Sequence, residues 1–225
     1  GDAEALAACD WTSCGGVEFS IRGNQRYKPA DFRLEGDWSA AAPFLVCGAV
    51  FGSAEVCALD TESLQADISI LDLLVRAGAG VSYDESAVSV CKGPLCAFDF
   101  SFDNCPDLFP CAVVLAMFCE GSSRLRGVSR LRTKESDRLM SVCAMLDGFG
   151  VPYTFESDAL VVEGHTYDFR LLNGALLKGG RFDSFSDHRI AMAIKAASPG
   201  ADSPVEIAGC ECVAKSFPDF FGMWD

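Results

Sequence analysis

The segment Asp37-Trp-Ser-Ala-Ala-Ala-Pro-Phe-Leu-Val46 is an acidic residue followed by an Ala-rich apolar run. Segments of the same kind begin at Asp107 and at Asp187, so the starts are 70 and 80 residues apart. Each segment then passes a Gly and enters a short strand-forming run. Such spacing indicates an internal repeat. Because Asp is a preferred helix N-cap, we predict that each of the three caps a helix.

A second predicted helix follows the first two segments, over residues 66–78 and 135–148. Each of these helices is followed by a Gly and a predicted hairpin. The hairpins pair 80–83 with 87–90 and 150–153 with 159–162. Each unit is therefore predicted as strand–helix–strand–helix–strand–strand. The third unit is expected to stop within its second helix, at 217–224.

The predicted helices carry Ala, Cys, Met and Leu on nearly every face, which is typical of helices buried all round. We therefore predict an α/β (α+β) fold of repeated βαβαββ units, with helices inside and sheets outside. Residues 37–225 are expected to form one domain of three units, the last incomplete. Residues 1–36 do not fit the repeat; we expect strands at 17–21 and 31–34 and assign them to the end of a preceding domain. The chain begins with Gly1, so further sequence is expected upstream.

The overall charge limits the classes of partner. The 225 residues are 50% hydrophobic and carry a net charge of −14, from 18 basic and 32 acidic residues. Nucleic-acid binding through the phosphate backbone needs a basic face, so no nucleic-acid partner is expected. No apolar run approaches the ~20 residues of a membrane span, so no membrane partner is expected either. We predict a cytoplasmic location.

The twelve cysteines are expected to be reduced. Many lie in apolar stretches, as Cys47, Cys111 and Cys143 do, where a free Cys acts as a small hydrophobic side chain. Cys210 and Cys212 form the only close pair, and no second pair has the spacing of a zinc site. We therefore expect no metal site.

The basic residues are unevenly placed, with six of the 18 between residues 124 and 138. Such a cluster in an acidic chain is compatible with a site for a small anion, and equally with a solvated loop. Its members are Arg124, Arg126, Arg130, Arg132, Lys134 and Arg138.

Functional residue types gather at the predicted helix starts. Asp187, His188 and Arg189 place a carboxylate, an imidazole and a guanidinium at one of them. Backbone N–H groups at a helix start favour an anion, and Arg189 can clamp a carboxylate or phosphate through two hydrogen bonds. The alternative is that Asp187 only caps the helix and Arg189 is a surface residue.

The segment 134–138 opens another predicted helix. Lys134 and Arg138 are four residues apart, so we expect them on one helix face with a negative group between them. Glu135 is a candidate acid or base; the alternative is that the cations of the segment only form ordinary salt bridges with Asp137. Lys215 occupies the matching place in the third unit, 28 residues after Asp187, as Lys134 lies 27 after Asp107.

The repeat thus predicts an anion site with proton-transfer groups at one end of the domain. On the residues alone, this indicates transfer or elimination chemistry on an anionic small molecule. The predicted site contains Asp107, Lys134, Glu135, Arg138, Asp187, His188, Arg189 and Lys215.

These residues carry a family resemblance. The segments 132–138, 186–192 and 214–220 resemble three signature segments of the 5-enolpyruvylshikimate-3-phosphate synthases. Residues 105–107 resemble the segment that holds the family's catalytic Asp. Residues 23–27 and 35–37 resemble its interdomain crossing and the start of its second domain. The resemblance runs in order over nearly the whole chain.

The resemblance implies an activity. Members of the family transfer the enolpyruvyl group of phosphoenolpyruvate to the 5-hydroxyl of shikimate 3-phosphate and release phosphate, in the shikimate pathway of aromatic amino acid biosynthesis. The reaction passes through a tetrahedral intermediate and needs no cofactor. By position, Asp107 is the implied base for the hydroxyl. Glu135 is the implied acid for the methylene carbon, from which it later recovers the proton.

The resemblance also implies binding roles. Arg138 and Arg189 would hold the phosphoenolpyruvate carboxylate, with Lys215 on its phosphate. Lys134 would contact shikimate 3-phosphate. His188 would support this shell, and Asp187 is counted with it among the substrate-binding residues. The chain carries Ser39-Ala40-Ala41 where relatives often have a serine pair, and Arg130 where some relatives have a polar amide. The implied contacts on the shikimate side therefore differ here.

The family builds its site between two similar domains, and this chain resembles the second. The missing first domain is therefore an expected partner, and the chain by itself is expected to be inactive. Two rival interpretations stay open. One is a relative of UDP-N-acetylglucosamine enolpyruvyl transferase, and the other is a non-catalytic anion-binding or association module.

Overall fold

The computed structural model describes residues 18, 20–84, 87–165 and 177–224. The chain divides into two compact units, Gly1–Leu34 and Glu35–Asp225. The described part of the first unit contains neither helix nor strand, so the strand predicted over 31–34 is wrong. A strand requires a hydrogen-bonded neighbour, and no described strand pairs with this segment. Part of the strand predicted over 17–21 lies outside the described residues.

The first repeat follows the predicted order from its first helix onward. Asp37 caps that helix, because its carboxylate accepts the N–H groups of Ser39 and Ala40. The strands form an antiparallel sheet in the order β1-β3-β2, with Val81 opposite Val90. The elements are α2 (Trp38–Phe51), β1 (Ser53–Cys57), the 3-10 helix η1 (Ala66–Ser69), α3 (Ile70–Arg76), β2 (Gly80–Tyr83) and β3 (Ala87–Cys91).

The second repeat has the complete predicted order. Its sheet runs β4-β5-β7-β6, with β4 parallel to β5 and the other pairs antiparallel. The second helix ends at Gly150, whose φ of 76° is a left-handed conformation that favours glycine. The elements are β4 (Asp99–Ser101), η2 (Pro106–Leu108), α4 (Phe109–Met117), β5 (Gly121–Arg126), η3 (Val128–Thr133), α5 (Arg138–Phe149), β6 (Tyr153–Glu156) and β7 (Ala159–Gly164).

The third repeat departs from the prediction after its second strand. In place of an α-helix, two 3-10 segments follow. Pro218 lies between them, and a proline inside a helix removes a backbone donor and clashes with the preceding turn. The elements are β8 (Gly180–Asp183), α6 (His188–Ala197), η4 (Ser198–Gly200), β9 (Val205–Ala208), η5 (Cys210–Lys215) and η6 (Phe221–Trp224), and β8 is parallel to β9.

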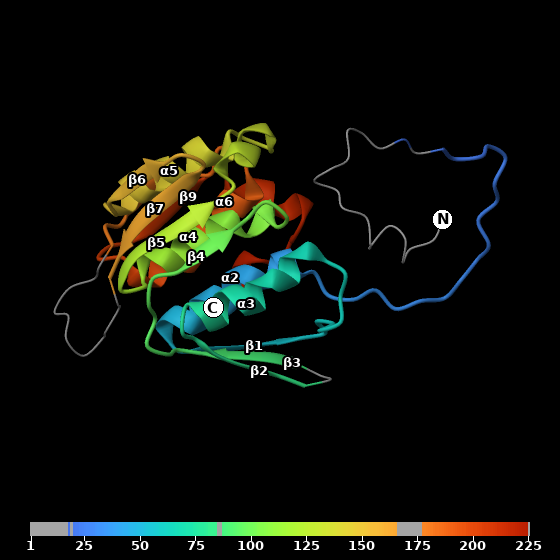
Figure 1. Cartoon of the computed structure of the whole chain (residues 1–225), viewed down its shortest axis with the longest axis horizontal. Helices are drawn as coiled ribbons and strands as arrows, with labels where there is room; N and C mark the ends of the chain where they lie inside the picture. The colour runs from blue at the N-terminus through green and yellow to red at the C-terminus, as the bar shows by residue number, and fades with distance from the viewer. Residues whose placement is uncertain (1–17, 19, 85–86, 166–176, 225) are drawn as a thin grey trace. The chain divides into compact units, whose positions relative to one another are not determined.

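The first helices of the three repeats, α2, α4 and α6, contact one another and share a core. Every residue of α4 is buried. In α2, Gly48 allows β1 to approach, since an added Cβ would lie 2.6 Å from the backbone nitrogen of Ala54. Figure 1 shows α2 and α3 over the β1-β3-β2 sheet, with α4 beside the strands of the second repeat. Within the described residues, no helix is long and apolar enough to cross a membrane.

Candidate active site

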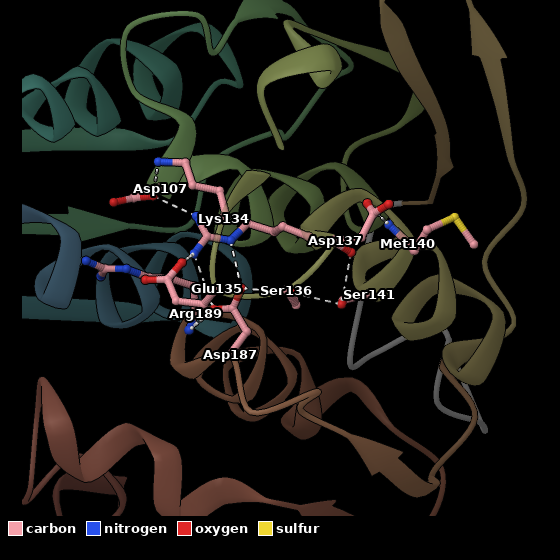
Figure 2. A network of polar contacts seen from close by, with 10 residues as sticks. Asp107, Lys134, Glu135, Ser136, Asp137, Met140, Ser141, Asp187 and Arg189 are labelled. Carbon is pink, nitrogen blue, oxygen red and sulfur yellow. Dashed lines mark hydrogen bonds and ion pairs between the residues drawn. The ribbon is translucent and has the colours of Figure 1, made fainter. Parts of the chain in front are cut away.

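One buried arginine joins the second and third repeats. Arg138 is the first residue of α5, and its side chain is 0% exposed. Its Nε donates to Asp187 Oδ2 at 2.9 Å, its Nη1 to Asp107 at 2.6 Å and its Nη2 to Glu135 at 2.6 Å. A guanidinium suits this task because its donors form a rigid planar fork. Figure 2 shows the three carboxylates converging.

Lys134 also reaches Asp107, with 3.1 Å between Nζ and Oδ1. The predicted shared helix face is wrong, because Lys134 has an extended backbone and α5 starts only at Arg138. The expected negative group between the two cations is present and is Asp107. Burial alone would raise the pKa of Asp107, but its hydrogen bonds and its attraction to Arg138 and Lys134 outweigh burial, so its pKa lies below the ordinary value.

Asp187 combines two tasks at the start of α6. Its Oδ1 accepts the backbone N–H of Arg189 at 2.9 Å, which confirms the predicted N-cap. The other oxygen accepts Arg138 Nε and the Ser136 hydroxyl, the latter at 3.2 Å. The side chain is fully buried. Its negative charge is therefore balanced inside the protein, mainly by Arg138.

The cap predicted at Asp107 and the alternative salt bridge to Asp137 are wrong. Asp107 is no N-cap, because it lies inside η2 and its carboxylate turns to cations distant in sequence. Asp137 caps α5 instead, accepting the N–H of Met140 at 3.3 Å. Arg138 forms its salt bridge within the segment to Glu135, where the alternative had placed Asp137.

His188, Arg189 and Lys215 lie on the third-repeat side of this cluster. Burial lowers the pKa of His188, and the charges of Arg189 and Lys215 lower it further, whereas Asp187 and Glu135 oppose them. Arg189, Lys215, Asp187 and Glu135 are thus all within electrostatic reach of His188. His188 Nδ1 and Arg189 Nε are buried without a hydrogen-bond partner among the described residues. Lys215 is exposed at the end of η5.

The cluster of basic residues between 124 and 138 is divided by the fold. Arg124 and Arg126 lie on β5 and pair at the surface with Asp99, so they are not part of the site. Arg130 donates to the backbone oxygen of Asp103, beside the site. All eight predicted site residues nevertheless gather in one region. Five are joined by direct contacts: Asp107, Lys134, Glu135, Arg138 and Asp187.

A polar cleft of about 550 Å³ opens next to Asp107 and Lys134. Its lining includes Asp67, a buried carboxyl that the sequence analysis missed. The repeat held a signal for it, because Asp67 follows Asp37 by 30 residues, as Asp137 follows Asp107. The full lining is Ser39, Gln65, Ala66, Asp67, Asp103, Asn104, Pro106, Asp107, Arg130 and Lys134.

The residue types of the site suit proton transfer beside an anion. Asp107 and Glu135 are each 37% exposed, so both can meet a ligand, whereas Arg138 and Asp187 are enclosed. Arg189 and Lys215 add positive charge on one side. Among the residues that the structure describes, no group of three or more His, Cys, Asp or Glu side chains is placed to hold a metal ion.

Repeated α/β units that bring cations and carboxylates to their helix starts define the class of this domain. A sequence model described as EPSP synthase (3-phosphoshikimate 1-carboxyvinyltransferase) matches residues 12–224. The chain therefore belongs to the EPSP synthase family, as the signature segments predicted.

Individual relatives agree with this assignment. The chain is 37% identical over 204 residues to the 3-phosphoshikimate 1-carboxyvinyltransferase of Clostridium kluyveri, covering 91% of this chain and 46% of that protein. It is also 37% identical over 218 residues to the protein of that name from Dehalococcoides mccartyi, covering 97% and 49%.

The fold agrees as well. A structure of EPSP synthase from Acinetobacter baumannii superposes with a TM-score of 0.75 and 29% identity, over 84% of this chain and 45% of that one. The chain thus spans about half the length of the relatives and of the solved structure that it matches.

Proposed function

We propose that the protein containing this chain transfers the enolpyruvyl group of phosphoenolpyruvate to the 5-hydroxyl of shikimate 3-phosphate and releases phosphate. The observation that carries the proposal is the convergence of Asp107, Glu135 and Asp187 on the buried Arg138. These residues lie in segments that resemble the family's signatures, inside the matched range 12–224. Proton-transfer groups and fixed cations are what a charge-developing addition and elimination require.

Asp107 and Glu135 carry the proton transfers in this proposal. Asp107 accepts the proton of the 5-hydroxyl of shikimate 3-phosphate while the hydroxyl oxygen attacks C2 of phosphoenolpyruvate. Glu135 donates a proton to the methylene carbon, which gives a tetrahedral intermediate. The phosphate then leaves and takes up the proton that Asp107 accepted, the methyl group returns a proton to Glu135, and the carbon–carbon double bond forms again. Both side chains are partly exposed and lie on either side of one guanidinium, which keeps them close.

The cations bind the anionic groups of the substrates. Arg189 and Arg138 hold the phosphoenolpyruvate carboxylate, and Lys215 holds its phosphate. Arg138 Nη2 donates to Asp187 Oδ1 at 3.3 Å as well as to Glu135. Since Glu135 is the more exposed of these two carboxylates, a ligand carboxylate reaches Arg138 by displacing Glu135. That displacement frees Glu135 to face the methylene carbon.

Three other residues complete the shell. Lys134 contacts shikimate 3-phosphate from the rim of the cleft, where it already binds Asp107. His188 and Asp187 support the arginines from the start of α6. The reaction proposed needs no cofactor.

The rest of the protein supplies the other half of the site. We propose that residues 37–225 are the second domain, built with helices inside and sheets outside, and that 1–36 cross from the first. The buried, mutually contacting helices α2, α4 and α6 support this arrangement. A first domain closing over the cleft would complete the shikimate 3-phosphate pocket, and the enzyme would act in the cytoplasm.

Phosphate release from phosphoenolpyruvate plus shikimate 3-phosphate tests the proposal. It is measured on this chain, on the chain mixed with a separately produced first domain, and on the whole protein. We expect turnover in the whole protein and in the mixture, and none in the chain alone. Turnover only with UDP-N-acetylglucosamine would instead assign the rival acceptor, and no turnover by the folded whole protein would favour an association module.

A further inference from the structure

Asp67 is a buried carboxyl at the site that the proposed reaction does not use. It is 7% exposed and lies in η1, in the first repeat, whereas the proposed acid and base lie in the second. Ser39 Oγ donates a hydrogen bond to its Oδ2. Gln65 locks the segment to the start of α2, because its Oε1 accepts the N–H of Trp38 at 3.0 Å and its Nε2 donates to Gly36 O at 2.8 Å.

Asp67 and Asp107 line the same cleft, and their charges interact. Burial raises the pKa of Asp67 above the ordinary value; the Ser39 hydrogen bond opposes burial, the charge of Asp107 adds to it, and Arg189 opposes it. The titratable or charged groups within electrostatic reach of Asp67 come from several elements: Asp37 before α2, Cys105 before η2, Asp107 in η2, Cys111 in α4 and Arg189 in α6.

Asp107, the proposed base, has a lowered pKa, and the charge of Asp67 opposes that lowering. Two cations, Arg138 and Lys134, stabilise the ionised form of Asp107, and a carboxylate so stabilised accepts a proton poorly. A second negative charge across the cleft destabilises that ionised form, because coupling between two titrating groups is reciprocal. The negative charge of Asp67 therefore makes Asp107 a stronger proton acceptor.

We propose that ionised Asp67 is a positioning residue for the reaction, acting through Asp107 and held in place by Ser39. This inference rests on the proposed function, because it assigns Asp107 as the base. Asp67 contributes its charge across the cleft and contacts no reacting atom. The positive charge of Arg189 also reaches Asp67 and partly offsets its negative charge.

The test compares Asp67→Asn with the wild-type whole protein by measuring kcat at saturating substrates as a function of pH. The Asn side chain keeps an oxygen for Ser39 and removes only the charge. Below the pKa of Asp67 the wild-type residue is neutral too, so the two enzymes should have equal kcat. Above it, the wild type should be faster by roughly tenfold, a typical effect of one nearby charge. A ratio that stays constant with pH overturns the proposal, because it indicates a purely structural role.

Two further variants sharpen the test. Ser39→Ala removes a hydrogen bond that lowers the pKa of Asp67, so the pH at which kcat rises should move upward; an unmoved rise overturns the proposal even where Asp67→Asn does not fold. Asp72→Asn is the matched control, since it removes an exposed carboxylate on α3, and its pH profile should match the wild type.

A readout without turnover separates this inference from the proposed function. The side-chain ¹³C resonance of Asp67 should titrate at lower pH in Asp107→Asn, because the neighbouring charge is gone. If the wild-type protein is inactive but the shift is observed, the proposed function is disproved, whereas the electrostatic coupling between Asp67 and Asp107 is confirmed. An active protein without the shift would disprove the role of Asp67 alone.

Discussion

At the scale of single residues, Arg138 holds three carboxylates that would otherwise repel one another. In Arg138→Lys the ammonium is a point charge, so it cannot serve Asp107, Glu135 and Asp187 together. Leaving the buried carboxylate of Asp187 without its guanidinium partner should cost about 3 kcal/mol of unfolding free energy. Urea unfolding followed by circular dichroism measures the loss. Arg126→Lys, in an exposed pair on β5, is the control and should leave the midpoint unchanged; equal effects of the two variants would contradict the role of Arg138.

His188 should make the stability of the chain depend on pH. Burial, followed by the charge of Arg189, holds its folded-state pKa below the unfolded value of about 6.5. The folded state therefore resists protonation, so its stability is full above that value and falls as pH drops below it. Urea midpoints measured between about pH 7 and pH 5 should decline less in His188→Gln than in the wild type. His165→Gln, at the chain's other histidine, should keep the wild-type decline. Equal declines in wild type and His188→Gln would show that another group is responsible.

At the scale of elements, the capping Asp residues have separable tasks. Asp37 only caps α2, through the N–H groups of Ser39 and Ala40. Its replacement in Asp37→Ala should lower the unfolding free energy by about 1 kcal/mol, and Asp37→Asn should restore most of it, because an amide oxygen also caps. Unfolding in urea measures both. A loss in Asp37→Asn as large as in Asp37→Ala would show that charge, and not the cap, stabilises this helix start.

Sequence patterns predicted local features well and long-range ones poorly. The caps at Asp37 and Asp187 and the hairpin of 80–83 with 87–90 depend on neighbours in sequence, and they are confirmed. The second hairpin is present, but its first strand is Tyr153–Glu156 where 150–153 was predicted. Asp107 was wrongly predicted as a cap because its partner Arg138 is 31 residues away. Lys134 was placed on a helix because spacing cannot reveal that the helix begins four residues later.

The missed and wrong elements have a common physical cause. Asp67 is buried by contacts between η1 and α2 that no single motif encodes. The strand predicted over 31–34 has suitable residues and no described partner. The helix predicted at the end of the third repeat ignored Pro218, which favours 3-10 turns around it. In each case the structure is decided by a neighbour in space or by a single helix-breaking residue. The hydrophobic pattern of the sequence contains information on neither.

At the scale of the whole molecule, the core is continuous across the three repeats. Phe51 of α2 packs on Phe118 at the end of α4, with ring centroids 5.1 Å apart. Phe149 of α5 packs on Phe182 of β8, with ring centroids 4.3 Å apart. Each repeat therefore buries its neighbour's apolar surface, and residues 35–225 should unfold in one cooperative transition.

The cysteines report on that cooperative core. Cys57, Cys91 and Cys96 are exposed, whereas Cys111 and Cys119 are buried, and burial raises the pKa of each of these two thiols to about 12. Because the thiolate is the reactive form, iodoacetamide at pH 8 should modify the three exposed residues within minutes and spare the two buried ones. Peptide mass spectrometry identifies the modified sites. In urea above the midpoint all five should react together. Modification of Cys111 or Cys119 under native conditions, ahead of global unfolding, would show that the core opens locally at α4.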